Sequence, residues 1–401
     1  MLGIWMWADS LIGAGADAVF DRCAQIGVTD VFSLSKGLSG RCAFPTSFAP
    51  PMHAGRDLLS EATGAAHVRG IRLHAWFTSA QDAAYCAEHP DSGLVHFTKG
   101  PSNTIVSIAD RAYARHLHAI IGDLLERYPV DGLHLDYIRY NHLLYGWSES
   151  DTARYEQFGA DVSRIRRLVE RSFYGEKADA AAVFDAYRNG DADAQALAKA
   201  RISDVCRFAD TVLEDAREAR RDLILSAALM PEGAYDTVFS DLHYGQNYRA
   251  LCGRFDLILP MAYSAAYSMD ADWVKKVTQG AISCGKKVLT GLHAYDGATG
   301  LTLGQDLRAA LCVPKIGGVC LFRYGTSLLA TVQGKALDLF NPTDRTCSKI
   351  ILSDGAETIS LPVRLEPGQS ARLPLPFEAK TVRAWSGDAE VCVFLAGYGH
   401  A

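Results

Sequence analysis

A carboxylate ends the most informative strand-like segment of this chain. In residues 130–136 the side chains alternate, with Leu133 and Leu135 on one face and His134 and Asp136 on the other. One face of a barrel strand meets the outer helices, and the other points into the barrel. An inward Asp at the C-terminal end of such a strand lies where barrel enzymes keep their catalytic groups. We therefore expect Asp136 to take part in acid–base or nucleophilic chemistry.

The ends of the other predicted strands supply further groups. Two more carboxyl groups, Glu232 and Asp296, follow the predicted fifth and seventh strands. Strand ends also offer aromatic and hydrogen-bonding side chains, and the candidates for substrate binding are Trp7, His74, Trp76, His134, Arg139, Tyr263, His293 and Arg323. Cleaving a glycosidic bond needs two carboxyl groups, and sugars pack on aromatic faces while their hydroxyls bind polar groups. The set favours glycoside hydrolysis over phosphoryl or hydride transfer.

Each candidate also has a purely structural interpretation. Asp136 could cap a turn or pair with Arg139, and Glu232 could be a solvated loop residue. Asp296 precedes a glycine and could belong to a turn. The tryptophans could be core aromatics, and His134 could be a barrel histidine with its hydrogen bonds satisfied. The position at a strand end favours the functional interpretation most strongly for Asp136.

The segments that must position these groups alternate between short apolar runs and helical stretches. Such alternation predicts a parallel α/β sheet with helical crossovers. Eight strands are expected, as a (β/α)8 TIM barrel requires, at residues 2–7, 29–34, 70–77, 130–136, 223–230, 255–263, 287–293 and 317–323. Long connections lie at 80–107 and between the fourth and fifth strands, where Gly175–Ala200 looks like a helical insertion. Long loops on the catalytic face of a barrel shape a substrate cleft.

The pattern changes after Asn341 and Pro342. Short alternating segments follow, and they are separated by turn pairs such as Asp354-Gly355 and Pro367-Gly368. We therefore expect residues 1–340 to form the catalytic barrel. Residues 345–401 are expected to form a small antiparallel, sandwich-like β-domain.

The composition is ordinary for a globular protein and argues against several partner classes. Among 401 residues, 49% are apolar and 21% are charged, and the net charge is −6. No basic excess indicates nucleic acid, and no run of about 18 apolar residues predicts a membrane span. The N-terminus lacks signal-peptide features, and the ten cysteines are scattered without a CxxC pair. Both favour a cytoplasmic location with reduced thiols; export, with a signal peptide missing from this sequence, is the alternative.

Motifs for other chemistries are missing from the sequence. Residues 280–287 resemble a phosphate-binding loop, but Lys287 stands where Ser or Thr is needed, and the segment precedes a strand. There is no GxSxG and no HExxH. We expect no cofactor and no metal ion. A metal site formed by His74, His134 and Asp136 is conceivable but has no spacing signature.

Four motifs in sequence order resemble one known family. Residues 131–140 resemble the fourth-strand signature of the glycosyl-hydrolase-10-like barrel proteins, which has the form DGIHFDDIRYP. Residues 74–76, 256–263 and 317–325 resemble the third, sixth and eighth strands of that family. The chain departs from the pattern at Asn141, where the family often has Pro. Over residues 1–340, the resemblance implies a (β/α)8 barrel, a carbohydrate substrate and a catalytic carboxylate at Asp136.

Two fold-level analogies bear on the mechanism. The chitinase signature DGxDxDxE would place its acid on Ile138, so a chitinase mechanism is not expected. The α-amylase-like order of Asp, Glu and Asp after strands four, five and seven is matched by Asp136, Glu232 and Asp296. This analogy implies a retaining enzyme with Asp136 as nucleophile or charge stabiliser, Glu232 as acid/base and Asp296 on sugar hydroxyls. The alternatives are a non-catalytic carbohydrate-binding protein on a degenerate barrel, or a metal-dependent polysaccharide deacetylase or lyase.

Overall fold

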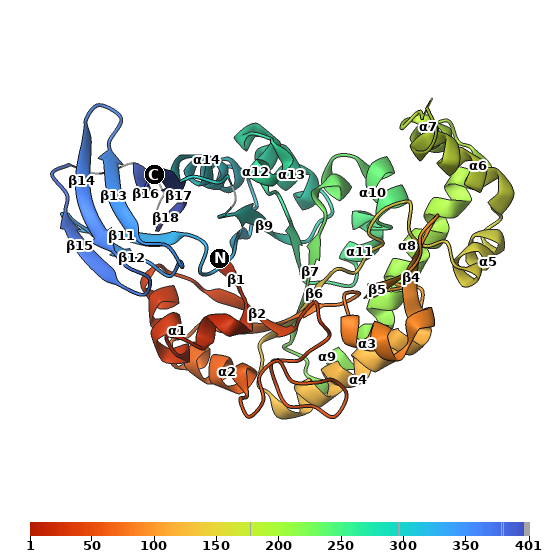
Figure 1. The fold of residues 1–401 in the computed structure, drawn as a ribbon, viewed down its shortest axis with the longest axis horizontal. Coiled ribbons are helices and arrows are strands. Elements are labelled where there is room, and N and C mark those ends of the chain that lie inside the picture. Colours follow the sequence, from red (N-terminus) through yellow and green to blue (C-terminus); the bar gives the residue numbers. More distant parts are fainter. Residues whose placement is uncertain (177, 296, 378, 380, 397–401) are drawn as a thin grey trace.

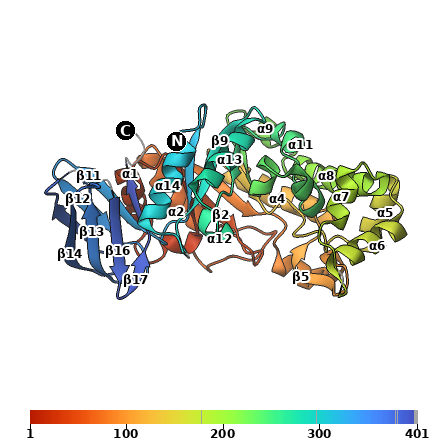
Figure 2. The same cartoon turned by 90° about the horizontal axis from the view of Figure 1, so that it is seen from above.

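The computed structural model describes residues 1–176, 178–295, 297–377, 379 and 381–396. Three parts lie in a row: a barrel in the middle, β-sheets of the C-terminal segment at one end, and a helical insertion at the other (Figures 1 and 2). None of the described helices is long and apolar enough to cross a membrane.

Eight parallel strands close into a barrel in the order β1-β10-β9-β8-β7-β6-β3-β2. Their bounds are β1 (Leu2–Met6), β2 (Asp30–Lys36), β3 (Arg72–Thr78), β6 (Gly132–Asp136), β7 (Ile224–Leu229), β8 (Leu257–Pro260), β9 (Lys287–His293) and β10 (Gly318–Phe322). Each predicted strand segment overlaps one of these strands, so the predicted (β/α)8 barrel is confirmed. Parallel neighbours cannot be joined by a tight turn, and the chain therefore returns through helical crossovers.

Helices cover the outside of the barrel and fill the connections between strands (Figure 1). Outside the insertions, the helices are α1 (Ala16–Gln25), α2 (Leu58–Val68), α4 (Arg111–Arg127), α9 (Ala216–Ala219), α10 (Thr237–His243), α11 (Tyr248–Cys252), α12 (Ser264–Tyr267), α13 (Ala271–Ile282) and α14 (Gly300–Leu311). Short 3-10 helices follow two barrel strands, η1 (Ala8–Leu11) after β1 and η3 (Pro231–Ala234) after β7.

Helix α4 leads into the strand that carries Asp136. It begins at a capping residue, Asp110, whose carboxylate accepts hydrogen bonds from the backbone N–H groups of Ala112 and Tyr113 at 2.8 and 3.0 Å. Leu117 and Ile121, one helical turn apart, are buried on the face that packs against the barrel. This packing fixes the start of β6 and hence the depth at which its C-terminal carboxylate lies.

Two insertions enlarge the connections around β6. The first, between β3 and α4, contains α3 (Ala83–Glu88), η2 (Pro90–Ser92), β4 (Gly93–His96) and β5 (Gly100–Val106). The second, between β6 and β7, contains α5 (Glu149–Gln157), α6 (Val162–Phe173), α7 (Ala182–Arg188) and α8 (Ala192–Val212). The helical insertion predicted at residues 175–200 is part of this second group, which begins earlier and has a hydrophobic cluster of its own.

Arg201 in α8 ties the second insertion to the loop that follows β6. The side chain is fully buried. Its two terminal nitrogens donate to the carbonyl oxygens of Tyr145 at 2.8 Å, His243 at 2.9 Å and His142 at 3.1 Å. One guanidinium thus satisfies carbonyls of the loop after β6 and of the C-terminal end of α10, which keeps the chain beyond Asp136 in place.

The C-terminal segment forms two packed sheets with strand orders β15-β12-β11-β18 and β14-β13-β16-β17. The bounds are β11 (Leu328–Gln333), β12 (Ala336–Phe340), β13 (Cys347–Ser353), β14 (Thr358–Leu365), β15 (Ser370–Pro374), β16 (Thr381–Ser386), β17 (Ala389–Val391) and β18 (Val393–Ala396). Buried residues from both sheets form one hydrophobic cluster. Because β11 and β12 pair with β18 and β15, the sheets begin at Leu328, before the boundary that we expected near residue 340.

Candidate active site

A cavity of about 640 Å³ opens at the C-terminal ends of the barrel strands. Its walls are largely aromatic, and the lining rings are Trp5, Trp7, Trp76, Tyr137, Tyr263, Tyr267, Tyr295 and Phe322. The ionisable side chains on its lining, besides the tyrosines, are Asp9, Arg41, His53, Asp136 and Arg139. Ligand sites in barrel enzymes lie on this face.

Asp136 is the buried carboxyl group of this cavity. It ends β6, and the next residue, Tyr137, adopts a left-handed conformation with φ 54°. That turn directs the Tyr137 N–H back onto the Asp136 carboxylate, where it donates to Oδ1 at 2.7 Å. The indole N–H of Trp76, on the neighbouring strand β3, donates to Oδ2 at 3.2 Å. Both oxygens are therefore oriented before a substrate arrives.

The same position makes Asp136 titrate close to neutral pH. Burial raises the pKa of its carboxyl group to about 6, against the opposing effects of the Tyr137 N–H, the Arg139 charge and the Trp76 indole. A carboxyl group with this pKa can both hold and release a proton near physiological pH. This is the property required of a general acid/base.

Trp76 and Tyr263 form neighbouring parts of the aromatic wall, as predicted from their strand ends. The Tyr263 ring stacks on Phe322 at 5.5 Å between centroids, and Trp76 meets Phe322 edge-on at 6.2 Å. Burial raises the pKa of Tyr263 well above its usual value, so its hydroxyl remains protonated and available as a donor. The cavity thus combines ring faces with hydrogen-bonding groups.

Two predicted binding residues lie behind the aromatic wall instead of on it. His293 is buried and stacks on Tyr263 with ring centroids 5.5 Å apart. The Arg323 guanidinium lies 3.5 Å from the centroid of the Trp7 ring, which is itself 40% exposed at the cavity. Neither His293 nor Arg323 lines the cavity, so each would act on a substrate through the ring that it supports.

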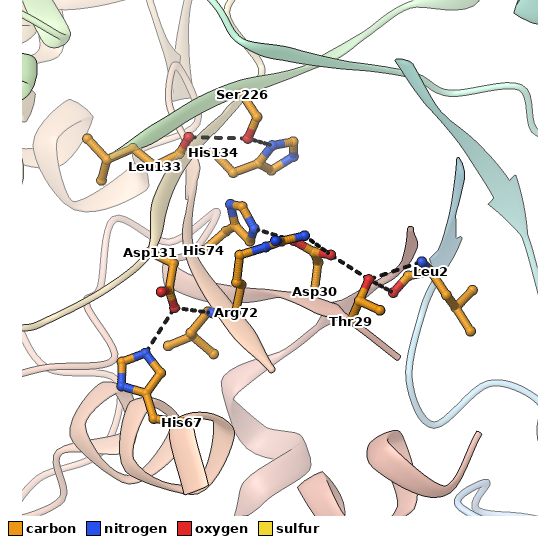
Figure 3. A network of polar contacts seen from close by, with 11 residues as sticks. Leu2, Thr29, Asp30, His67, Arg72, His74, Asp131, Leu133, His134 and Ser226 are labelled. Carbon is orange, nitrogen blue, oxygen red and sulfur yellow. Dashed lines mark hydrogen bonds and ion pairs between the residues drawn. The ribbon is translucent and has the colours of Figure 1, made fainter. Parts of the chain in front are cut away.

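His74 and His134 lie deeper in the barrel, in the polar network of Figure 3. His74 Nε2 is 3.0 Å from the Asp30 carboxylate, which also binds Arg72 at 2.7 and 2.9 Å. Both histidines are fully buried and neither lines the cavity. The structure therefore does not bring either of these predicted residues to the aromatic wall.

The protonation state of His134 follows from its partners. His134 Nε2 accepts a hydrogen bond from the Trp5 indole N–H at 3.0 Å, since an indole nitrogen can only donate. Nδ1 must then carry the proton, and it donates to Ser226 Oγ at 2.9 Å. Burial lowers the pKa of His134 well below its usual value, so the ring is neutral. Its role in this arrangement is to link strands β1, β6 and β7.

Glu232, the predicted second carboxyl group, lies on η3 just outside the cavity lining. It is buried, and the Tyr267 hydroxyl donates to its Oε1 at 3.1 Å. Its Oε2 is buried without a hydrogen-bond partner among the described residues. Burial raises the pKa of Glu232, while Tyr267 and Arg139 lower it. Tyr267 and Arg139 line the cavity and Glu232 does not, so the predicted role of Glu232 stays a prediction.

The remaining predicted carboxyl group, Asp296, lies outside the described residues. Among the residues that are described, no group of three or more His, Cys, Asp or Glu side chains is arranged to hold a metal ion. The metal site considered from the sequence, formed by His74, His134 and Asp136, does not appear as such a group.

Several lining residues that lie beyond the strand ends were not predicted from the sequence. Tyr137 directly follows Asp136, and Tyr267 follows Tyr263 by one helical turn. Asp9 and His53 come from the connections after β1 and β2 and contact each other at 2.8 Å, while Arg41 lies in the β2 connection. No sequence signal singled out these side chains, because loop residues have no periodicity that shows their direction.

No curated protein matches the chain in sequence. Among solved structures, it is similar to the glycoside hydrolase domain of PgaB (BpsB) from Bordetella bronchiseptica, with a TM-score of 0.64 and 14% identity over 79% of this chain and 92% of that chain. It is also similar to a β-galactosidase from the psychrophilic Marinomonas ef1, with a TM-score of 0.58 and 13% identity over 81% of this chain and 54% of that chain. At these identities the likeness shows the fold.

A family model gives the more specific result. It matches residues 46–167, which contain β3, α4 and β6 with Asp136 at its end. The resemblance noted at residues 131–140 is therefore confirmed: over residues 46–167 this chain matches the family described as glycosyl hydrolase-like 10.

Proposed function

We propose that this protein is a glycoside hydrolase that cleaves a glycosidic bond in an oligo- or polysaccharide. The observation that carries the proposal is the position of Asp136, a buried carboxyl group with a pKa of about 6 on the wall of an aromatic cavity. The family match over residues 46–167 and the glycoside hydrolase fold support the same reaction class.

We assign Asp136 the role of acid/base. A glycosidic oxygen must receive a proton as the bond breaks, and the donor must contact the substrate. Asp136 lines the cavity and keeps its proton up to a pH of about 6. This reverses the roles expected from the sequence, in which Glu232 was the acid, because Glu232 is held behind the wall by Tyr267.

Glu232 is then the proposed nucleophile or charge stabiliser of a retaining reaction. It follows the strand next to β6, and it reaches a sugar only after the Tyr267 side chain moves. Retaining enzymes hold their carboxyl groups about 5–5.5 Å apart, and inverting enzymes about 6.5–9.5 Å. NMR of the first-formed product anomer tests this assignment, and an inverted product would contradict it.

A second candidate function is carbohydrate binding on a barrel without catalysis. It is favoured by one observation, that Glu232 does not line the cavity beside Asp136. Binding alone needs the aromatic rings but no second carboxyl group.

One experiment separates the two functions. The protein is incubated with aryl glycosides of both anomeric configurations and with a series of polysaccharides, and released phenol and new reducing ends are measured. Hydrolysis of at least one substrate is expected. Binding of a polysaccharide in calorimetry without any release would favour the binding protein instead.

A further inference from the structure

The charged side chains around the cavity are unequally partnered. Asp9 accepts a hydrogen bond from His53, and Asp136 accepts hydrogen bonds from Trp76 and Tyr137, as described above. In contrast, Arg41 and Arg139 have no carboxylate within 4.0 Å among the described residues. Within the described part of the chain, the cavity wall thus holds two guanidinium groups that form no ion pair, although the net charge of the protein is −6.

Arg139 is fixed in place although it lacks an anionic partner. Its guanidinium carbon lies 5.2 Å from the centroid of the Tyr137 ring and 5.5 Å from that of Tyr244. Nη1 donates to the Tyr140 carbonyl and the Asn141 side-chain oxygen, both at 3.4 Å, near the outer limit for a hydrogen bond.

Most of the hydrogen-bonding capacity of Arg139 is unused. A guanidinium has five N–H donors. Within the described part of the chain, Nη2 makes no hydrogen bond and Nε is buried without an acceptor. A fork of donors held against two rings suits an anion with two or more acceptor oxygens, because little side-chain freedom is lost when the anion binds.

The carboxyl groups near Arg139 do not take the place of such an anion. Asp136 and Glu232 both interact with the Arg139 charge, but neither forms an ion pair with it among the described residues. Burial also raises the pKa of both carboxyl groups, that of Asp136 to about 6. Neither carboxyl group therefore occupies the unused donors of Arg139.

We infer that the sugar bound beside Asp136 carries an anionic substituent, a carboxylate or a sulfate ester, and that Arg139 binds it with Arg41 contributing at the cavity mouth. The inference rests on the proposed function in that it concerns the same cavity. It adds the substrate class, acidic glycans, which the glycoside hydrolase assignment leaves open.

Binding to matched polymers tests the inference independently of hydrolysis. A uronate-containing polysaccharide is compared with the same polymer after carboxyl reduction, and a sulfated polysaccharide with its desulfated form, by calorimetry at pH 7. At least about tenfold tighter binding to the anionic member of one pair is expected, and the pair that responds identifies the substituent. Equal affinities within both pairs, or no binding to any of the four polymers, would overturn the inference.

Arg139→Met keeps the length and apolar body of the side chain and removes the charge. The preference for the anionic polymer should fall about tenfold in this variant. Arg221→Met is the matched control, since Arg221 is exposed just before β7, at the opposite end of the barrel, and it should keep the preference. An unchanged preference in Arg139→Met would contradict the inference; if that variant does not fold, Arg41→Met is measured against the same criterion.

The two proposals fail in different ways. Preferential binding of an acidic polymer with no hydrolysis of any substrate would contradict the proposed glycoside hydrolase activity and support the inference about the anionic substituent. Hydrolysis of glycans with equal affinity for charged and neutral polymers would contradict the inference about the anionic substituent and support the proposed hydrolase activity.

Discussion

The indole N–H of Trp76 donates a hydrogen bond to Asp136 Oδ2 at 3.2 Å across the neighbouring strands β3 and β6. The contact joins an aromatic wall residue to the carboxyl group that we propose as the acid/base. Together with the Tyr137 N–H on Oδ1, it fixes the plane of the carboxyl group. Orientation of this kind reduces the reorganisation needed to reach a transition state.

The pH dependence of hydrolysis should report the titration of Asp136. Burial raises its pKa to about 6, so the protonated form needed by a general acid persists up to that pH and is lost above it. We expect kcat/KM to fall as pH rises through about 6. If Asp136 were the nucleophile, the ionised form would be required, and kcat/KM would instead fall as pH drops below that value. A pH–rate profile between pH 4 and 9 distinguishes these outcomes.

Replacing Trp76 by Phe should shift the alkaline limb of the pH–rate profile, where kcat/KM falls as Asp136 loses its proton. The Trp76 hydrogen bond lowers the Asp136 pKa, so its loss should raise that pKa by roughly half to one unit, for a hydrogen bond of about 1 kcal/mol. The alkaline limb should shift upward by the same amount. Trp147→Phe is the control, because the Trp147 indole donates to the Leu143 carbonyl in the insertion. If the alkaline limb stayed at the same pH in Trp76→Phe, the Trp76 hydrogen bond would have no effect on the pKa of the catalytic acid.

Tyr267→Phe tests the part played by Glu232. The Tyr267 hydroxyl lowers the Glu232 pKa through its hydrogen bond to Oε1. Without it, Glu232 should stay protonated to higher pH, and the acidic limb of kcat/KM should shift to higher pH. Tyr187→Phe, which removes a hydroxyl bound to Asp241, should leave that limb in place. If the acidic limb of kcat/KM in Tyr267→Phe lay at the same pH as in the wild-type protein, Glu232 would take no part in the reaction.

Asp136 should also cost the protein stability at neutral pH. The native state binds the Asp136 proton more tightly than the unfolded state does, because burial raises the pKa to about 6. The free energy of unfolding therefore falls as pH rises from the usual pKa of an Asp to about 6. Asp136→Asn should therefore raise the free energy of unfolding by about 3 kcal/mol at pH 7.5 and by much less at pH 4. Urea unfolding at both pH values measures this difference. Equal effects at the two pH values would mean that Asp136 is not held with a raised pKa.

The fold and the position of Asp136 could be predicted because buried strands leave a strong pattern. Leu133 and Leu135 pack toward the outer helices, and Asp136 points into the cavity, as their alternation indicates. The sequence pattern does not show how deep in the barrel an inward-facing side chain lies. His134 lies only two residues before Asp136 on the same face, yet it bonds to Trp5 and Ser226 in the barrel interior.

The directions of side chains in loops and turns could not be predicted from the sequence either. Glu232 follows a barrel strand like Asp136, but the 3-10 turn η3 directs it behind Tyr267, and sequence spacing does not show the direction of a side chain in such a turn. Arg41 was not foreseen at all, since it lies in an irregular connection. The start of the β-sheets at Leu328 was missed because strand β11 follows β10 after a short turn and resembles a continuation of the barrel.

The rate of Asp136→Asn on the best substrate of the wild-type protein tests the proposed site most directly. The substitution removes an ionisable proton at nearly constant volume, and Asp222→Asn, an exposed residue just before β7, is the matched control. We predict that kcat falls at least about a thousandfold, or about 4 kcal/mol, while circular dichroism and polysaccharide affinity stay close to wild type and Asp222→Asn remains fully active. A folded Asp136→Asn variant with near-wild-type turnover would contradict the assignment of this cavity as a glycosidase active site.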